Sequence, residues 1–203
     1  MWFSLFIGML ASYLLGNLNG AVCMSALKHD DVRSHGSGNA GLTNFIRNYG
    51  VGQAAYVILI DAGKAIVSCL LTGLLLEPFG YYRMGTALGG FAVMLGHNFP
   101  ALLGFKGGKG ILSGLFIALT VDWRIALIIL GVFAVAYLLT QYVSLASVLA
   151  ALAFSVSFAA LHFGDWVVMS CGIVMGAMAV YMHRSNIQRL IRGEESKTNL
   201  FKK

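Results

Sequence analysis

Charged residues are scarce in this chain. They make up 11% of its 203 residues, whereas soluble domains carry roughly 25%. Hydrophobic residues reach 58%, so too few polar side chains remain to cover a globule of this size. The composition therefore excludes an ordinary soluble domain and indicates lipid as the surrounding solvent.

Proline and cysteine are scarce as well. Only two Pro occur, so few helices need to be broken. Cys23, Cys69 and Cys171 lie in apolar runs, and an odd count without a pairing pattern predicts small packing residues rather than disulfides.

The first residues contain no basic segment, and the apolar stretch at 1–27 is longer than a signal-peptide core. We therefore expect the first membrane span there.

Long apolar runs are what the chain has in abundance. The candidate spans are 3–26, 51–76, 84–98, 110–121, 125–141, 143–162 and 165–182. The runs 84–98 and 110–121 are short, since about 20 residues are needed to cross a hydrocarbon core of ~30 Å. They flank the polar, Gly-rich segment 96–110. Short helices around such a segment indicate non-helical backbone that lines a cavity at membrane depth.

Basic residues fall mostly on one side of the predicted membrane if the segments 27–50, 97–110 and 183–203 share that side. The basic residues of these segments are Lys28, Arg33, Arg47, Lys106, Lys109, Arg184, Arg189, Arg192, Lys197, Lys202 and Lys203. The other side holds only Arg83 and Arg124, and Lys64 lies within a span. The positive-inside rule places the basic side in the cytoplasm, so the net charge of +6 predicts no nucleic-acid partner.

The sequence thus predicts an all-α, polytopic membrane helix bundle that forms one domain over residues 1–203. About seven transmembrane helices are expected, two of them short. The N-terminus lies outside and the C-terminus in the cytoplasm, which requires an odd number of crossings. Five crossings would also satisfy this orientation if the two short helices are re-entrant.

The first polar cluster follows the first span. It consists of His35, Gly36, Ser37, Gly38, Asn39, Gly41, Thr43, Asn44 and Arg47. Its G-x-G-x-x-G pattern would indicate dinucleotide binding only after a strand in a βαβ unit, and this composition predicts neither. Glycines let backbone N–H groups approach an anion, and Arg forks suit phosphate. The spacing alone leaves an anion site and a plain polar loop open.

The second cluster joins the two short runs. After Gly96 and His97 it contains Lys106, Gly107, Gly108, Lys109 and Gly110. It is not a Walker loop, because Gly110 follows Lys109 and position 103 is Leu. A Gly-rich loop with two lysines at the start of a helix is nevertheless an anion site by its physics. The alternative is a set of charges that only anchors the orientation.

The third cluster lies in the tail, where His183 and Asn186 share a helix face at i, i+3. Arg189 and Arg192 extend this face, which alone is typical of a basic helix on anionic lipid. Within the second span, Asp61 and Lys64 have the same spacing, and we expect a structural ion pair that faces the site. Three polar clusters on one membrane face indicate a pocket for one or two phosphates.

These motifs together resemble the membrane-integral bacterial acyl-phosphate:glycerol-3-phosphate 1-acyltransferases, over nearly the whole chain. The match rests on His35-Gly-Ser-Gly-Asn39 with Thr43, Asn44 and Arg47, on Asp61 with Lys64, on Gly96-His97 with Phe105-Lys-Gly-Gly-Lys-Gly110, on Tyr142-Val-Ser-Leu-Ala-Ser147, and on His183, Asn186, Ile187, Arg189, Leu190, Gly193 and Glu195. Positions 16–19 depart from the family, with Gly-Asn-Leu-Asn for the usual Gly-Ser-Ile-Pro, and Gln141 stands where a basic residue is common. These departures leave room for a non-catalytic paralogue.

The resemblance implies transfer of an acyl group from acyl phosphate to the 1-hydroxyl of glycerol 3-phosphate. The products are lysophosphatidic acid and inorganic phosphate, and neither a cofactor nor a metal is implied. The expected setting is the cell membrane of a bacterium, among membrane lipids, with the site open to the cytoplasm and an acyl-phosphate-forming enzyme as a functional partner. A small anion or phosphate transporter is the rival interpretation from another class.

Roles for the site residues follow from the resemblance. The Ser37–Asn39 loop with Arg47 is expected to hold phosphate beside the reacting carbonyl, and the Lys106–Gly110 loop to hold the phosphate of glycerol 3-phosphate. Ser144, His183 and Asn186 are expected to close the pocket, and Glu195 to fix the tail by pairing with a base. The general base stays open between His97, which titrates near neutral pH, and the departing phosphate, whereas Ser37 as a covalent nucleophile is disfavoured.

Overall fold

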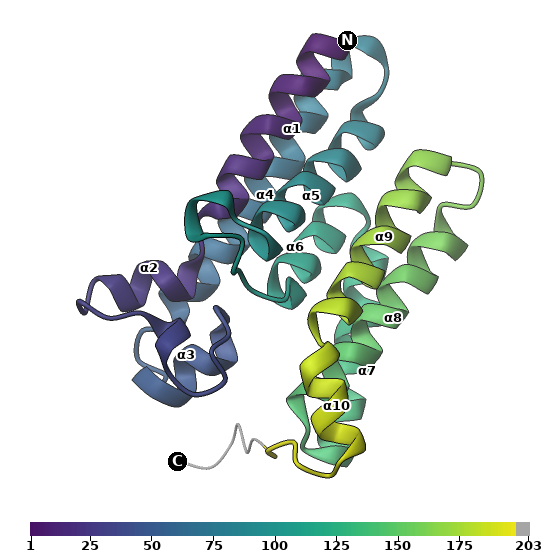
Figure 1. Ribbon diagram of the computed structural model, residues 1–203. Coiled ribbons are helices and arrows are strands. Elements are labelled where there is room, and N and C mark those ends of the chain that lie inside the picture. The colour runs from purple at the N-terminus through teal and green to yellow at the C-terminus, as the bar shows by residue number, and fades with distance from the viewer. Residues whose placement is uncertain (198–203) are drawn as a thin grey trace. The chain divides into compact units, whose positions relative to one another are not determined.

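The computed structural model describes residues 1–197, and over these residues every regular element is a helix (Figure 1). Lys202 and Lys203, which entered the charge argument, lie outside the described residues. The described chain forms two compact units, Met1–Val121 and the part from Asp122 onward. A single domain over residues 1–203 stays a prediction.

The first unit is built from six α-helices and three short 3-10 turns. Their order is α1 (Trp2–Asn17), α2 (Gly20–Ala26), η1 (Val32–Ser34), α3 (Leu42–Tyr49), α4 (Ala54–Leu76), η2 (Glu77–Phe79), α5 (Tyr82–Asn98), η3 (Ala101–Leu103) and α6 (Ile111–Val121). Helix α1 packs against both α4 and α5, and α6 packs against α4 (Figure 1). The short elements α2, η1 and α3 pack on one another, and α2 and α3 also pack on α4.

The second unit contains four helices in its described residues. They are α7 (Trp123–Thr140), α8 (Val143–Leu161), α9 (Trp166–Met182) and α10 (Arg184–Ile191). Helix α8 packs between α7 and α9, and α10 continues from α9 after a bend of 54° and contacts α8 (Figure 1).

The helices agree closely with the predicted spans. Four segments are long and apolar enough to cross a membrane, namely Ala54–Phe79, Tyr82–Leu103, Trp123–Thr140 and Val143–Leu161. Two bent pairs pass the same test together, α1 with α2 at 46° and α9 with α10 at 54°, and α6 is a shorter apolar helix. The all-helical membrane fold is therefore confirmed, while the number of crossings and their orientation stay predictions.

Two details of the predicted spans were wrong. The segment expected at 84–98 is longer than predicted, because α5 begins at Tyr82 and ends at Asn98, and the candidate span that includes η3 has 22 residues, Tyr82–Leu103. The first span is not continuous, because it breaks between Asn17 and Gly20. Of the two helices expected to be short, only α6 is, with 11 residues.

Small residues bring α1, α4 and α5 together. A Cβ on Gly16 would lie 2.8 Å from the Cα of Gly96, and a Cβ on Gly85 would lie 2.5 Å from the carbonyl oxygen of Thr72. The hydroxyl groups of Ser12 and Thr72 are 3.0 Å apart, in a buried hydrogen bond between α1 and α4. Close backbone approach and interhelical hydrogen bonds are what hold helices together in lipid, where burial of apolar surface gives no advantage.

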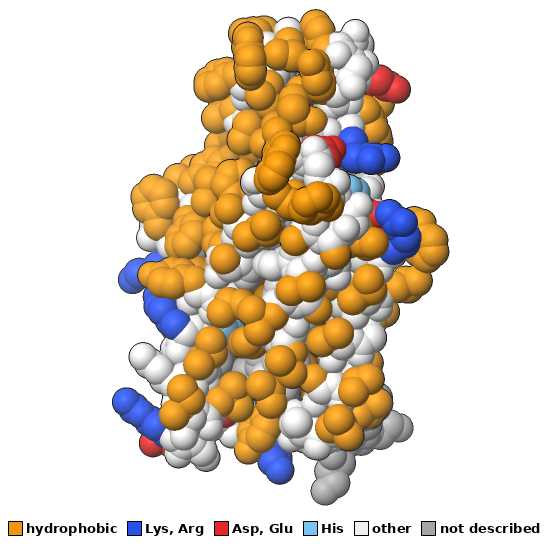
Figure 2. Space-filling view, turned by 90° about the vertical axis from the view of Figure 1, so that its right-hand side faces the viewer, with side chains coloured by type: hydrophobic (Ala, Val, Ile, Leu, Met, Phe, Trp, Pro, Cys, Tyr) orange, Lys and Arg blue, Asp and Glu red, His pale blue; other side chains and the backbone are white. Residues whose placement is uncertain are grey.

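Large hydrophobic side chains cover the outer surfaces of the helices. Figure 2 shows them over most of the visible face, with Lys and Arg in small separate groups. Trp2, Phe3, Leu59 and Leu139 are each at least 66% exposed. Apolar exposure on this scale would cause aggregation in water, but it suits contact with lipid.

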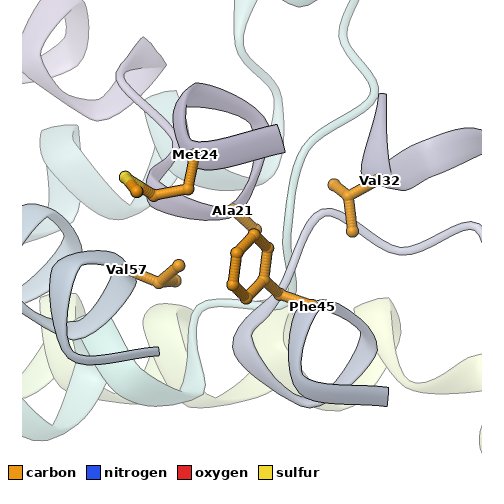
Figure 3. Close-up of a cluster of buried hydrophobic side chains, with 5 residues drawn as sticks. All are labelled: Ala21, Met24, Val32, Phe45 and Val57. Carbon is orange, nitrogen blue, oxygen red and sulfur yellow. The ribbon is translucent and has the colours of Figure 1, made fainter. Parts of the chain in front are cut away.

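A separate apolar cluster holds the polar end of the first unit. Ala21 and Met24 of α2, Val32 of η1, Phe45 of α3 and Val57 of α4 are buried against one another (Figure 3). Phe45 also stacks on Tyr49, with ring centroids 4.9 Å apart. The sequence predicted only a connection at 27–50. Instead, η1 and α3 are anchored elements, and the first polar cluster occupies the loop between them and the first two turns of α3.

Candidate active site

The first loop, residues 35–41, makes two turns in the left-handed region. Gly36 has φ 57° and Gly38 has φ 68°, conformations that cost little only for Gly. A Cβ on Gly36 would also lie 2.5 Å from Oδ1 of Asn44. The glycines of the first loop are therefore needed for its shape.

Asn44 organises the first loop from inside. Its Nδ2 donates to the carbonyl oxygens of Val32, His35 and Asn39 at 2.9, 3.0 and 3.1 Å. Its Oδ1 accepts from the backbone N–H of Ser37 at 3.0 Å. The side chain is only 2% exposed. We predicted Asn44 as a group for substrate, but its amide is committed to the loop, so it shapes the site instead.

The backbone N–H groups of the first loop are also largely committed. Ser37 donates to Asn44, Gly38 to the carbonyl oxygen of His35, and Gly41 to that of Asn39. The prediction that these glycines free backbone donors for an anion is therefore wrong at these positions. The side chains of Ser37 and Arg47 are exposed, and those of Asn39 and Thr43 are half-buried. Ser37 and Asn39 belong to the first loop and Thr43 and Arg47 to α3, and binding of phosphate by these side chains stays a prediction.

The carboxylate of Asp30 holds the start of the first loop in place. Nε2 of His35 lies 2.9 Å from the Asp30 carboxylate, and the Tyr49 hydroxyl donates to the same group at 2.7 Å. These hydrogen bonds, from Tyr49 first and His35 second, lower the pKa of Asp30 to about 2. Desolvation, followed by the neighbouring Asp30, raises the pKa of Tyr49 to about 12. The pair therefore holds its charged carboxylate and neutral phenol across the ordinary pH range.

The second loop, residues 104–110, packs so closely on its surroundings that Gly is required. The backbone N–H of Gly108 donates to the carbonyl oxygen of His97 at 3.0 Å. A Cβ on Gly107 would meet that same oxygen, and a Cβ on Gly108 would meet Nε2 of His97. We predicted that these glycines open the backbone to phosphate, but at Gly107 and Gly108 they serve contact with α5. Lys106 is exposed and Lys109 half-buried.

The two loops meet each other. A Cβ on Gly108 would lie only 2.8 Å from the carbonyl oxygen of Ala40, which belongs to the first loop. Arg33 strengthens this junction, because its guanidinium donates to the carbonyl oxygen of Leu103 at 3.0 Å and to that of Lys106 at 3.4 Å. Asp31 holds the same guanidinium through a fork of hydrogen bonds at 2.8 to 3.0 Å. The structure therefore brings the predicted residues of both loops to one end of the first unit.

A buried ion pair lies beneath the second loop. Nζ of Lys64 is 2.8 Å from Oδ1 of Asp61, with both side chains at most 3% exposed. The same Nζ contacts Nδ1 of His97 at 2.8 Å and donates to the carbonyl oxygen of Leu18 at 2.5 Å. An ammonium group has three donors, and these three short contacts, with a longer one to the carbonyl oxygen of Gly16 at 3.4 Å, engage all of them.

This geometry bears on the choice of general base. Because Lys64 has no lone pair to offer when it is an ammonium, Nδ1 of His97 is the acceptor, and the ring proton sits on Nε2. Nε2 faces the backbone of Gly108, and the side chain is 4% exposed. The nitrogen that would need a free lone pair therefore already carries the proton. The arrangement favours a supporting part for His97 over proton abstraction.

The tail residues are held within the second unit by one carboxylate. Nδ2 of Asn186 donates to Oε1 of Glu195 at 2.7 Å, and Nε of Arg189 donates to Oε2 at 2.6 Å. Partial burial alone would raise the pKa of Glu195, but the hydrogen bonds from Asn186 and Arg189 outweigh it and leave the pKa below its usual value. The pairing of Glu195 with a base is as the sequence predicted.

The remaining predicted residues of the second unit are buried. Nδ1 of His183 lies 2.8 Å from the carbonyl oxygen of Ala179, one turn earlier in α9. Ser144, in the first turn of α8, is 7% exposed and helps to lower the pKa of Glu195, although its hydroxyl forms no hydrogen bond of good geometry within the described residues. Their predicted substrate contacts stay predictions.

Comparison with known proteins assigns the chain to a family. Residues 6–193 match the family model described as glycerol-3-phosphate acyltransferase. A protein of that name from Synechococcus is 39% identical over 184 residues, which cover 90% of each chain. Another of that name, from Prochlorococcus marinus, is 35% identical over 192 residues, which cover 93% of this chain and 95% of the relative.

Solved structures agree with this assignment. The crystal structure of PlsY, an integral membrane glycerol 3-phosphate acyltransferase, in its glycerol 3-phosphate form has a TM-score of 0.88 and 33% identity, over 98% of this chain and 100% of that one. The lysophosphatidic acid form of PlsY has a TM-score of 0.84 and 34% identity, over 97% of this chain and 96% of that one.

Proposed function

Because this chain belongs to the glycerol-3-phosphate acyltransferase family, we propose that it transfers an acyl group from acyl phosphate to the 1-hydroxyl of glycerol 3-phosphate. The C–O bond of the ester forms as the bond between the acyl carbon and the phosphate oxygen breaks. The products are lysophosphatidic acid and inorganic phosphate. This is an early acylation step of phospholipid biosynthesis.

The observation that carries the proposal is the junction of the two loops in the first unit. The carbonyl oxygen of Ala40 faces Gly108, and Arg33 joins η1 to Leu103 and Lys106. The exposed side chains of Ser37, Arg47 and Lys106 thus belong to neighbouring backbone segments. Both substrates carry a phosphate group, and Arg and Lys side chains beside small hydroxyl groups suit its charge and acceptor oxygens.

An acyl phosphate is already an activated mixed anhydride, so the reaction needs no covalent intermediate on the protein. What the site supplies is orientation of the hydroxyl against the carbonyl and stabilisation of developing charge. We assign Ser37, Asn39 and Arg47 to the phosphate beside the carbonyl, and Lys106 and Lys109 to glycerol 3-phosphate. The proton of the attacking hydroxyl passes to the departing phosphate, whose second pKa lies near ~6, since His97 offers no free lone pair.

The expected setting is the bacterial cell membrane, with seven crossings and the site at the cytoplasmic face. The similarity to an integral membrane protein supports a location in the membrane. The concentration of Lys and Arg in three connections supports the placement of these connections in the cytoplasm. Acyl phosphates hydrolyse readily, so an enzyme that forms them is the expected functional partner. Ser144, His183 and Asn186 of the second unit are proposed to contact substrate.

The first test gives purified, detergent-solubilised protein palmitoyl phosphate and glycerol 3-phosphate, and measures phosphate release together with lysophosphatidic acid by mass spectrometry. We expect release that requires glycerol 3-phosphate, matches the lipid product in amount, and falls at least about 100-fold in Ser37→Ala. Ser34→Ala is the matched control, because Ser34 is also exposed but lies outside the first loop. A transporter would release no phosphate and form no lipid product.

A further inference from the structure

The break between α1 and α2 carries two buried asparagines. Asn17 is 4% exposed and Asn19 is 1% exposed. Neither was among the residues that the sequence singled out for the site. Buried amides are normally fully hydrogen-bonded, so their partners show what these residues do.

Asn19 joins the break to the first loop. Its Oδ1 accepts from the backbone N–H of Val22 at 3.0 Å, which caps α2. Its Nδ2 donates to the carbonyl oxygen of Ala40 at 2.9 Å, across 21 residues of chain. That carbonyl is the one that faces Gly108, so Asn19 holds the point where the two loops meet.

Asn17 joins the same break to the approach of the second loop. Its Oδ1 accepts from the backbone N–H of Leu102 in η3 at 3.0 Å. Its Nδ2 donates to the carbonyl oxygen of Tyr13 at 2.7 Å, which fixes the amide to α1. The Tyr13 hydroxyl adds a second link, because it donates to the carbonyl oxygen of Phe99 at 2.9 Å.

The break itself is fixed from the other side. Lys64 donates to the carbonyl oxygen of Leu18 at 2.5 Å, and Oδ1 of Asp61 accepts from the backbone N–H of Gly20 at 3.2 Å. The buried ion pair of α4 therefore satisfies backbone groups that the interruption of the helix leaves open. A break held in this way is a rigid base and not a hinge.

We propose that Asn17 and Asn19 are positioning residues, which hold the second and the first loop in register for acyl transfer through separate hydrogen bonds from one rigid break. The proposal rests on the proposed function for its kinetic part. Small displacements of oriented groups reduce rates strongly, so loss of either bond is expected to alter catalysis beyond any loss of folded protein. Each asparagine holds one loop, so substitution of Asn19 and substitution of Asn17 should change different kinetic constants.

The test uses Asn19→Ser and Asn17→Ala in the full-length protein. Ser at position 19 retains an N-cap acceptor for α2 but is too short to reach Ala40. We expect Asn19→Ser to lower kcat about tenfold, because the first loop orients the carbonyl. We expect Asn17→Ala to raise the KM for glycerol 3-phosphate about tenfold, because the second loop holds its phosphate. Asn17→Asp keeps an acceptor for the backbone N–H of Leu102. Its KM for glycerol 3-phosphate should therefore lie close to that of the unmodified protein.

Ser12→Ala is the control, since it removes a buried hydrogen bond of the same α1 that does not reach either loop. It should lower the thermal midpoint with kcat and KM unchanged. Hydrogen–deuterium exchange is measured in parallel, and we expect faster exchange at 38–41 in Asn19→Ser and at 101–108 in Asn17→Ala. If both variants match Ser12→Ala in kinetics and exchange, the proposal fails. If the unmodified protein makes no lysophosphatidic acid, the proposed function fails, and exchange alone decides the positioning role.

Discussion

The two units hold their polar residues in different ways. In the first unit, the loops are fastened by several long-range hydrogen bonds from different elements, including those of Asn19, Arg33 and Asn44. In the second unit, Asn186 and Arg189 both donate to the one carboxylate of Glu195. The comparison teaches that hydrogen bonds from several elements preorganise the loops of the first unit, whereas in the tail one carboxylate joins two side chains of the same helix.

The largest effect is expected at the buried ion pair beneath the first unit's loops. Lys64→Met leaves the Asp61 carboxylate buried without its partner, which typically costs about 3–5 kcal/mol. The double variant Asp61→Asn/Lys64→Met contains no uncompensated charge and should recover more than half of this loss. The free energy of unfolding of the unmodified protein, of Lys64→Met and of the double variant is measured in mixed detergent by circular dichroism. A double variant as unstable as Lys64→Met would show that geometry, and not charge, dominates at this pair.

The next effect tests the junction of the loops. In Gly108→Ala the new methyl group meets His97 and Ala40, so the second loop must shift and acyl transfer should fall about 100-fold. Gly63→Ala is the matched control, because nothing lies near its Cβ in α4. Lysophosphatidic acid formation and the thermal midpoint are measured together. Unchanged activity in Gly108→Ala would mean that contact between the loops does not matter for catalysis.

A smaller effect is expected in the second unit. Glu195→Ala removes the carboxylate that accepts from both Asn186 and Arg189, and hydrogen bonds to charged groups contribute roughly 1.5–3 kcal/mol. We expect about a tenfold loss of kcat with a modest drop in thermal midpoint. Glu195→Gln retains an acceptor for Asn186. Its kcat and thermal midpoint should lie between those of Glu195→Ala and the unmodified protein. Glu194→Ala is the neighbouring exposed control, and an equal loss in that variant would show that tail charge matters rather than this contact.

The apolar runs predicted the helices well because lipid constrains them strongly. A span must satisfy its own backbone and present apolar side chains, so its length and position can be read from the sequence. The helix at Leu42–Tyr49 was missed because it has only eight residues and lies within a polar connection, although Leu42, Phe45, Ile46 and Tyr49 follow the i, i+3, i+4, i+7 pattern of an amphipathic helix. The break after Asn17 was missed because the residues that stabilise it, Asp61 and Lys64, come from another helix.

The candidate site was predictable by residue type but not by orientation. The pattern located Ser37, Arg47 and Lys106, which the structure leaves exposed. It could not show that the Asn44 amide turns inward, because an amide has the same donors and acceptors in both settings. Arg33 was counted only as a charge, although its spacing from Asp31 was a signal of a paired guanidinium. Contacts between segments far apart in the chain decide such cases.

The smallest effect is expected at Asp30, the partly exposed carboxylate that holds His35 at the start of the first loop. Because other hydrogen bonds also hold this loop, loss of the carboxylate should cost the first unit little stability. The pKa of Asp30 is lowered to about 2 from its ordinary value of 3.8. A carboxylate with a depressed folded pKa stabilises the protein above the unfolded pKa, and this contribution is lost as the pH falls from about 4 to about 2. The thermal midpoint should therefore decline more steeply over that window in the unmodified protein than in Asp30→Asn, whereas the two should run in parallel between pH 5 and 8. Asp165→Asn, which changes a carboxylate of the second unit, is the comparison variant. A profile of Asp30→Asn that parallels the unmodified protein down to pH 2 would mean that His35 and Tyr49 gain nothing from the charge of Asp30, and that Asn19 and Asn44 hold the first loop without it.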